Sequence, residues 1–122
     1  MESIEVNITV RRNGTVTEQI TRRVEVQESQ GFSILKANDG DITTFTEIPA
    51  EQLDTIQAFV LRTDKAVTVR FNGQSDAGIL LNTGGIIIVF DATINAGSAI
   101  ANASVNNNSG APALLEGFAA GE

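Results

Sequence analysis

The stretch IEVNITVRRNGTVTEQITRRVEV, residues 4–26, decides how the fold begins. In its first half, apolar and polar side chains alternate, which is typical of a strand with one buried face. The pair Asn13-Gly14 follows, and this pair is the strongest short signal for a hairpin turn. The sequence therefore predicts a long N-terminal β-hairpin over residues 1–27.

The register of this hairpin can be tested against the apolar residues. A two-residue loop would set the apolar face of one strand beside the polar face of the other, because a shift of one residue turns every side chain over. A three-residue loop at 12–14 instead pairs Val10 with Val16. We therefore expect the three-residue loop, with a bulge at its glycine.

Residues 28–122 carry short apolar segments at regular spacing, most of them bounded by Gly, Asn or Asp. Such a series of short strands and turn signals indicates a sandwich or a barrel. A single helical turn is expected at residues 49–53. We predict an all-β chain, a small antiparallel β-sandwich or jelly roll over residues 28–122, joined to the hairpin in a single domain.

Two strand predictions in this body rest on apolar patterning. The apolar residues of 56–61 match those of 67–71 across a loop at 63–65, which predicts a second hairpin. The run IIIVF at residues 86–90 is apolar throughout, which is typical of a strand buried on both faces.

Composition narrows the chemistry. The chain contains no Cys and no His, so it lacks disulfides, thiolate ligands and the most common general base. Its net charge of −7 disfavours nucleic acid and anionic membranes as partners. The acidic N-terminus lacks the pattern of a signal peptide. We expect no cofactor, no metal and no catalytic residue.

One short motif has the oxygen ligands of a cation site. Asp39-Gly40-Asp41 places two carboxylates at the close spacing found in calcium loops, but the further acids of an EF-hand are missing. Asp and Gly also supply the geometry of tight turns, and a turn is the use that we expect.

Charges are distributed unevenly along the chain. Every Lys and Arg lies at or before Arg70, and residues 77–115 contain one charged residue, Asp91. A free surface normally carries about a quarter charged residues. Two explanations are open: this half forms the core strands, or another copy of the chain covers part of it. The second explanation predicts an oligomer interface at Ile86, Ile88, Phe90, Asn106, Asn108 and Pro112.

Arginines mark both ends of the predicted hairpin. Arg11 and Arg12 lie at its tip, and Arg22 and Arg23 lie near its base. Such charges can simply keep an exposed strand edge from pairing. They also suit an arm that reaches a neighbouring subunit and meets carboxylates there. Both explanations stay open, and the second makes these four residues partner contacts.

Residues 55–120 resemble a known family. The segments VTVRFNG (67–73), LLNTGG (80–85) and SVNNNSGAPA (104–113) are similar to strand and turn patterns of small virion proteins of tailed bacteriophages. Among these, the resemblance is to capsid decoration (cement) proteins with small jelly-roll or sandwich folds. It implies many copies on a capsid surface, often as trimers, with the major capsid protein lattice as partner. It carries over no catalytic residue and does not include the N-terminal hairpin.

The favoured hypothesis is therefore a virion structural protein, made in the host cytoplasm, that binds and stabilises an assembled capsid. One alternative is a tail, fibre or head–tail connection subunit. Another is a carbohydrate-binding or adhesive module, although such sites usually present Trp or Tyr and this chain has neither. An enzyme is the least favoured hypothesis, because no activated nucleophile or acid–base pair is recognisable in the sequence.

Overall fold

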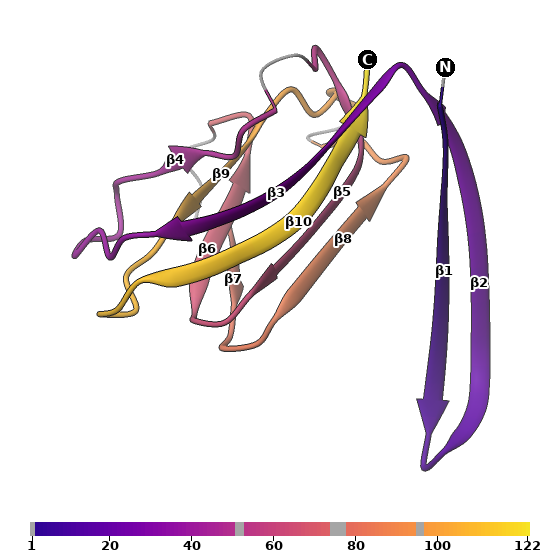
Figure 1. Cartoon of the computed structure of the whole chain (residues 1–122), viewed down its shortest axis with the longest axis horizontal. Coiled ribbons are helices and arrows are strands. Elements are labelled where there is room, and N and C mark those ends of the chain that lie inside the picture. The colour runs from indigo at the N-terminus through magenta and orange to yellow at the C-terminus, as the bar shows by residue number, and fades with distance from the viewer. Residues whose placement is uncertain (1, 51–52, 74–77, 95–96) are drawn as a thin grey trace.

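The computed structural model of the chain is all-β, as the sequence predicts (Figure 1). It describes residues 2–50, 53–73, 78–94 and 97–122, so the helical turn expected at 49–53 lies partly outside the described residues. The strands are β1 (Glu2–Arg12), β2 (Thr15–Val26), β3 (Glu28–Lys36), β4 (Thr46–Glu47), β5 (Ile56–Thr63), β6 (Val67–Phe71), β7 (Ile79–Leu81), β8 (Ile86–Phe90), β9 (Ala103–Asn106) and β10 (Ala113–Gly121). Within the described ranges, no helix has the length and apolar character needed to cross a membrane.

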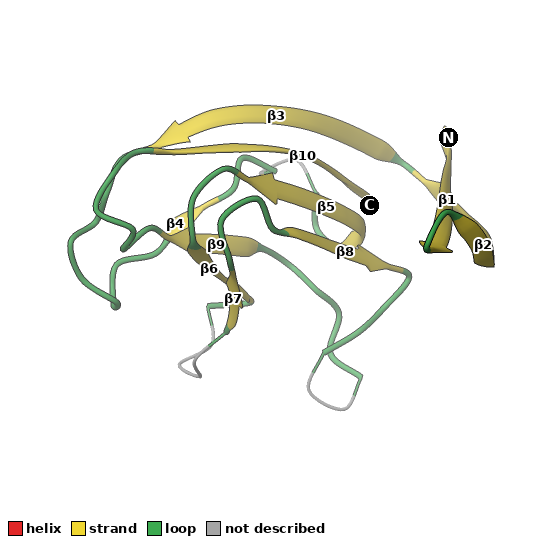
Figure 2. Ribbon diagram, turned by 90° about the horizontal axis from the view of Figure 1, so that it is seen from below, coloured by secondary structure: helices red, strands yellow, loops and turns green. Residues whose placement is uncertain are grey.

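Strands β3 to β10 form the body of the protein. They make two four-stranded antiparallel sheets, with strand orders β3-β10-β5-β8 and β4-β9-β6-β7. Counted along the body, the first strand pairs with the last, the second with the seventh, the third with the sixth and the fourth with the fifth. A long antiparallel ribbon wrapped around a core gives this order, which is that of a jelly roll. The two sheets form two layers, and the β1–β2 hairpin lies beside them (Figure 2).

The core lies between the two sheets. Phe32 on β3 and Phe59 on β5 stack with ring centroids 6.2 Å apart. Phe71, on β6 of the other sheet, meets Phe59 edge-on at 5.7 Å. Aliphatic side chains from both inner faces surround these rings and complete one cluster of buried residues. Alternate residues of each strand therefore point into one core, as the period-two patterning predicts.

The predicted hairpin between residues 56–61 and 67–71 is wrong. The chain crosses from one sheet to the other at this loop, so β5 pairs with β8 and β10, whereas β6 pairs with β7 and β9. Phe59 and Val69 both point into the core from opposite layers. Two strands that face each other across a sandwich bury matching alternate residues, as a hairpin does, so the pattern alone did not distinguish the two arrangements.

The prediction that residues 86–90 are buried on both faces is also wrong. Among the described residues, β8 is an edge strand that pairs with β5 alone. Ile87 and Val89 pack against the core, whereas Ile86 and Ile88 on the other face are 55% and 40% exposed. An apolar run predicts a strand, but it does not reveal whether a second layer covers the outer face.

The N-terminal hairpin is present, but its register differs from the expected one. Asn13 and Gly14 form a two-residue turn, with φ angles of 52° and 80° that suit a type I′ turn. The ladder then shifts between Val10 and Arg11, and Thr17 is the extra residue of a bulge. The bulge, and not a longer loop, restores the match of apolar residues. Val10 consequently pairs with Glu18 and not with Val16.

A glycine in β10 tests how closely the strands approach. Gly117 lies beside Leu61 on the inner face, and a methyl group there would overlap the Val60 carbonyl oxygen and the Phe32 ring. We expect Gly117→Ala to lower the free energy of unfolding by about 1–3 kcal/mol or more, because the strands must move apart. The matched control is Gly31→Ala, whose methyl group would find its nearest neighbour at 3.8 Å. Urea denaturation of both variants measures the difference, and equal stabilities would contradict the close approach.

Candidate interaction surfaces

The hairpin has one polar face and one largely apolar face. On the polar face, Asn7 donates a hydrogen bond to Glu5 (3.0 Å), Thr21 donates to Asn7 (2.9 Å), and Arg23 lies 3.7 Å from Glu5. The opposite face, here called the apolar face of the hairpin, consists of Ile4, Val6, Ile8, Val10, Glu18, Ile20, Arg22 and Val24. The polar groups hydrogen-bond to one another and can face water. The apolar face is stable only when another layer packs on it.

The described part of the body covers the base of the apolar face. There, Val26, Ala58 and Ala120 are buried in a second small cluster, with Ile4, Val24, Phe90 and Phe118 packed around them. Further along the hairpin, Val10 is 47% exposed and Ile20 is 43% exposed. The hairpin projects away from the sheets over this part of its length (Figure 1).

The structure separates the four predicted arginines into two pairs. Arg22 reaches Asp91 (3.8 Å) and Arg23 reaches Glu5 (3.7 Å), so both have acidic partners within the chain. In the described part of the chain, no ion pair includes Arg11 or Arg12. The tip therefore presents two cations to solvent, beside a turn that is exposed on all sides.

A second apolar surface lies on the β3-β10-β5-β8 sheet, on the side away from the core. We call it the outer face of this sheet. Its exposed apolar residues are Leu35, Ile86, Ile88 and Leu114. Arg62 and Glu116 form an ion pair on it at 2.9 Å. Of the predicted interface residues, Ile86, Ile88 and Phe90 share this face, and Phe90 packs beside the base of the hairpin.

The other three predicted interface residues do not belong to this face. Asn108 and Pro112 are exposed in the connection between β9 and β10. The prediction for Asn106 needs correction, because this residue is only 2% exposed. Its amide donates to the carbonyl oxygens of Asp41 (2.9 Å) and Thr44 (2.8 Å), so it serves the interior of the chain.

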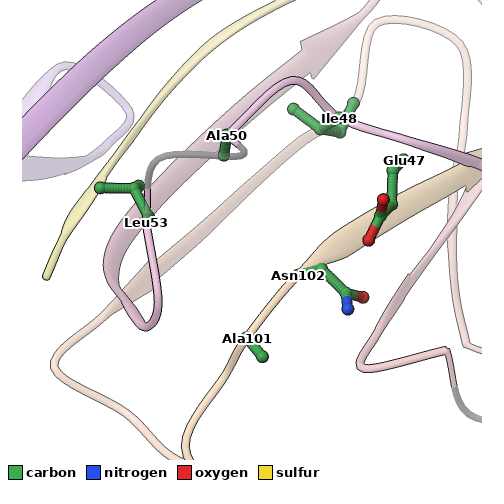
Figure 3. Close-up of a pocket in the computed structure, with 6 residues that line it drawn as sticks. All are labelled: Glu47, Ile48, Ala50, Leu53, Ala101 and Asn102. Atoms are coloured by element: carbon green, nitrogen blue, oxygen red, sulfur yellow. The ribbon is translucent and has the colours of Figure 1, made fainter.

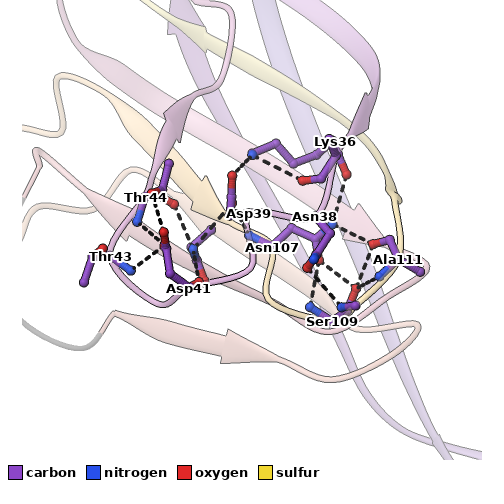
Figure 4. A network of polar contacts seen from close by, with 12 residues as sticks. Lys36, Asn38, Asp39, Asp41, Thr43, Thr44, Asn107, Ser109 and Ala111 are labelled. Atoms are coloured by element: carbon purple, nitrogen blue, oxygen red, sulfur yellow. Dashed lines mark hydrogen bonds and ion pairs between the residues drawn. The ribbon is translucent and has the colours of Figure 1, made fainter.

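Asn107 organises a polar network that the sequence did not reveal (Figure 4). Its buried amide donates to the carbonyl oxygens of Lys36 (2.9 Å) and Ala111 (2.8 Å), and its side-chain oxygen accepts from Ser109. Its backbone N–H donates to Asp39, which also accepts from the Lys36 ammonium at 2.6 Å. The network joins the end of β3, the end of β9 and the segment before β10, which is a structural role.

The Asp39-Gly40-Asp41 motif forms a turn, as expected. Gly40 has a φ of 74°, and the Asp41 carboxylate accepts hydrogen bonds from the backbone N–H groups of Thr43 and Thr44. These hydrogen bonds lower the pKa of Asp41 from its ordinary value of 3.8, and the bond from the Thr44 backbone has the largest effect. Across the described ranges, no three acidic residues gather where they could hold a metal ion.

A pocket of about 260 Å³ lies beside β4 (Figure 3). Ile48, Ala50 and Leu53 supply its apolar wall, and Glu47 and Asn102 supply its polar groups. Of the lining residues that the structure describes, Glu47 alone is titratable.

Comparison with known proteins gives no relative, because the chain matches no protein-family model, no curated protein and no solved structure. The resemblance to virion proteins therefore stays a prediction, and the surfaces described above must carry any functional proposal.

The polar network makes a prediction about stability. Asn107→Ala would remove the buried amide that donates to the carbonyl oxygens of Lys36 and Ala111 and accepts from Ser109, so we expect a loss of about 2–4 kcal/mol in the free energy of unfolding. Asn108→Ala is the matched control, since Asn108 is exposed, and it should change this value by about 0.5 kcal/mol or less. Chemical denaturation would contradict the role of the network if both variants were equally stable.

Asp41 makes a prediction about acid. Because its folded-state pKa lies below the unfolded value, its contribution to stability is fully present above the unfolded pKa. The contribution is lost as the pH falls through the lower, folded-state pKa. Carbon-detected NMR titration should place the Asp41 midpoint below 3.8, and Asp41→Asn should weaken the dependence of stability on acid. A midpoint at or above 3.8 would refute the turn contacts.

Proposed function

We propose that this chain is a virion structural protein that decorates an assembled bacteriophage capsid and stabilises it. The observation that carries the proposal is a jelly-roll body from which an amphipathic hairpin projects, with two cations at its tip that lack acidic partners in the described part of the chain. The jelly roll also occurs in capsid, lectin and cupin domains, so the fold alone does not decide the function. The strand and turn patterns of residues 55–120 favour the capsid.

The hairpin suits binding to a lattice of protein subunits. Arg11 and Arg12 are held at the end of a two-stranded ribbon, where they can reach carboxylates on a neighbouring capsid subunit. Arg22 and Arg23 lie closer to the body and are already engaged with Asp91 and Glu5. In this proposal the tip makes the contact with the lattice, and the base holds the hairpin to the body.

Binding of this kind stabilises a capsid by mass action. Copies that bind the assembled lattice, and not its separated subunits, shift the equilibrium towards assembly. The net charge of −7 keeps the free protein soluble before it binds. The surface of the virion is the proposed location, and a trimer is the oligomer that the resemblance favours.

Capsids assembled without this chain provide the test. Added protein should saturate them at a copy number proportional to the number of capsomers, measured by gel densitometry after the capsids are pelleted. Binding to the tail vertex alone would instead indicate a connection subunit. The double variant R11A/R12A should bind roughly tenfold more weakly, because it loses two exposed charge contacts.

The control for this experiment is Arg23→Ala, which removes an exposed arginine from the polar face of the same hairpin, away from its tip. It should bind capsids as tightly as the unmodified protein. Absence of saturable binding to capsids would overturn the proposed function, whereas equal weakening by both sets of changes would overturn the role of the tip.

A further inference from the structure

The distal part of the hairpin has an apolar face on which no other described segment of its own chain packs. A two-stranded ribbon is at best marginally stable in water unless another layer packs on it. Val10 and Ile20 remain 47% and 43% exposed there, although the turn and the bulge give the ribbon a defined register. The fold therefore maintains an ordered apolar surface at a distance from its own core.

The accessible surface area of the chain indicates how much area a partner could bury. The accessible area is 7041 Å². A compact monomer of 12.9 kDa is expected to expose about 6,300 Å². The excess of roughly 700 Å² is close to the roughly 800 Å² that each partner buries in an interface of standard size.

The base of the hairpin shows which surface its apolar face fits. Val24 and Val26 pack on the outer face of the β3-β10-β5-β8 sheet, against Phe90, Phe118 and the small residues between them. Small side chains at Ala58 and Ala120 allow the close contact. The outer face thus already accepts the alternating valines and isoleucines of this hairpin within one chain.

The same outer face continues beyond the base of the hairpin. The pairing of β5 with β8 sets Phe90, Ile88 and Ile86 in line on this face, from the covered end towards the free end. Ile88 and Ile86 are 40% and 55% exposed. On the body, the exposed residues Ile86 and Ile88 therefore lie next to the patch that the hairpin base covers. On the hairpin, the exposed residues Val10 and Ile20 lie beyond the same patch.

Charge favours a contact between the hairpin and the body of another copy. Residues 1–27 carry four basic and four acidic residues, so the whole net charge of −7 belongs to residues 28–122. Two bodies would repel each other, whereas a neutral hairpin with cations at its tip does not oppose an acidic body. A second copy of this chain offers both required surfaces.

We propose that the apolar face of the hairpin binds the outer face of a second copy of this chain. Val6, Ile8, Val10 and Ile20 of one copy would pack on Ile86 and Ile88 of the other, beyond the patch that each hairpin base covers in its own chain. The polar face of the hairpin stays in water, and the arginines at the tip extend past the contact. This inference concerns self-association and does not depend on a capsid.

Light scattering after size-exclusion chromatography measures the first consequence. The unmodified protein should have a mass of at least twice 12.9 kDa. Val10→Glu and Ile88→Glu place a charge on the two sides of the contact, and each should weaken association at least tenfold. Leu80→Glu is the control, because Leu80 is 65% exposed on the other sheet, and it should leave the mass unchanged.

Paramagnetic NMR locates the contact. The chain has no cysteine, so Gln19→Cys allows one nitroxide to be attached to the polar face of the hairpin. The nitroxide-bearing protein is mixed with ¹⁵N-labelled protein that carries no nitroxide. The nitroxide should then broaden the amide signals of residues 86–90 in the ¹⁵N-labelled copy. A monomeric mass at high protein concentration, broadening that omits β8, or equal disruption by Leu80→Glu would each overturn the proposal.

These results separate the two proposals. Val10→Glu and Ile88→Glu proteins that are monomeric and still saturate capsids would support the hairpin contact and leave the decoration role intact. Oligomers that fail to bind capsids would support the contact between copies and overturn the decoration role alone. Thermal unfolding of each variant verifies that its body is folded.

Discussion

The packing of Phe59 between the two sheets is the interaction on which the rest of the structure depends. Phe59 stacks on Phe32 within its own sheet and meets Phe71 of the other sheet edge-on. In a chain without Trp or Tyr, the Phe59–Phe71 pair provides an aromatic contact between the two layers. Each aromatic pair adds about 0.5–1.5 kcal/mol beyond the area it buries. The closed body leaves its outer face free to hold the hairpin base.

The sequence allowed prediction of the fold class and of most strands, because period-two alternation and Asn-Gly turns are local signals. It did not allow prediction of which strands pair. Residues 56–61 and 67–71 have matching patterns whether they pair in one sheet or face each other across the core. The bulge at Thr17 was missed for a related reason, since an extra residue in the strand corrects the parity as well as an extra residue in the loop does.

The candidate surfaces were only partly predictable. The apolar run at 86–90 and the alternation of the hairpin both marked real surfaces, but exposure depends on layers that lie far away in the sequence. Asn106 shows the opposite case, where a residue in a polar turn motif proved to be buried. Its burial depends on hydrogen bonds to the carbonyl groups of residues 41 and 44. A local sequence pattern does not indicate a hydrogen-bond partner more than 60 positions away.

The position of β10 has a consequence for how the protein is made. β10 lies in the middle of its sheet, between β3 and β5, yet it is formed by residues 113–121. During translation, β3 and β5 must therefore wait with unpaired edges until this segment has left the ribosome. The body cannot close before residues 113–121 have been synthesised, whereas the hairpin, complete by residue 26, can form early. A nascent chain of this kind depends on the charged residues of its first half to avoid pairing with its neighbours.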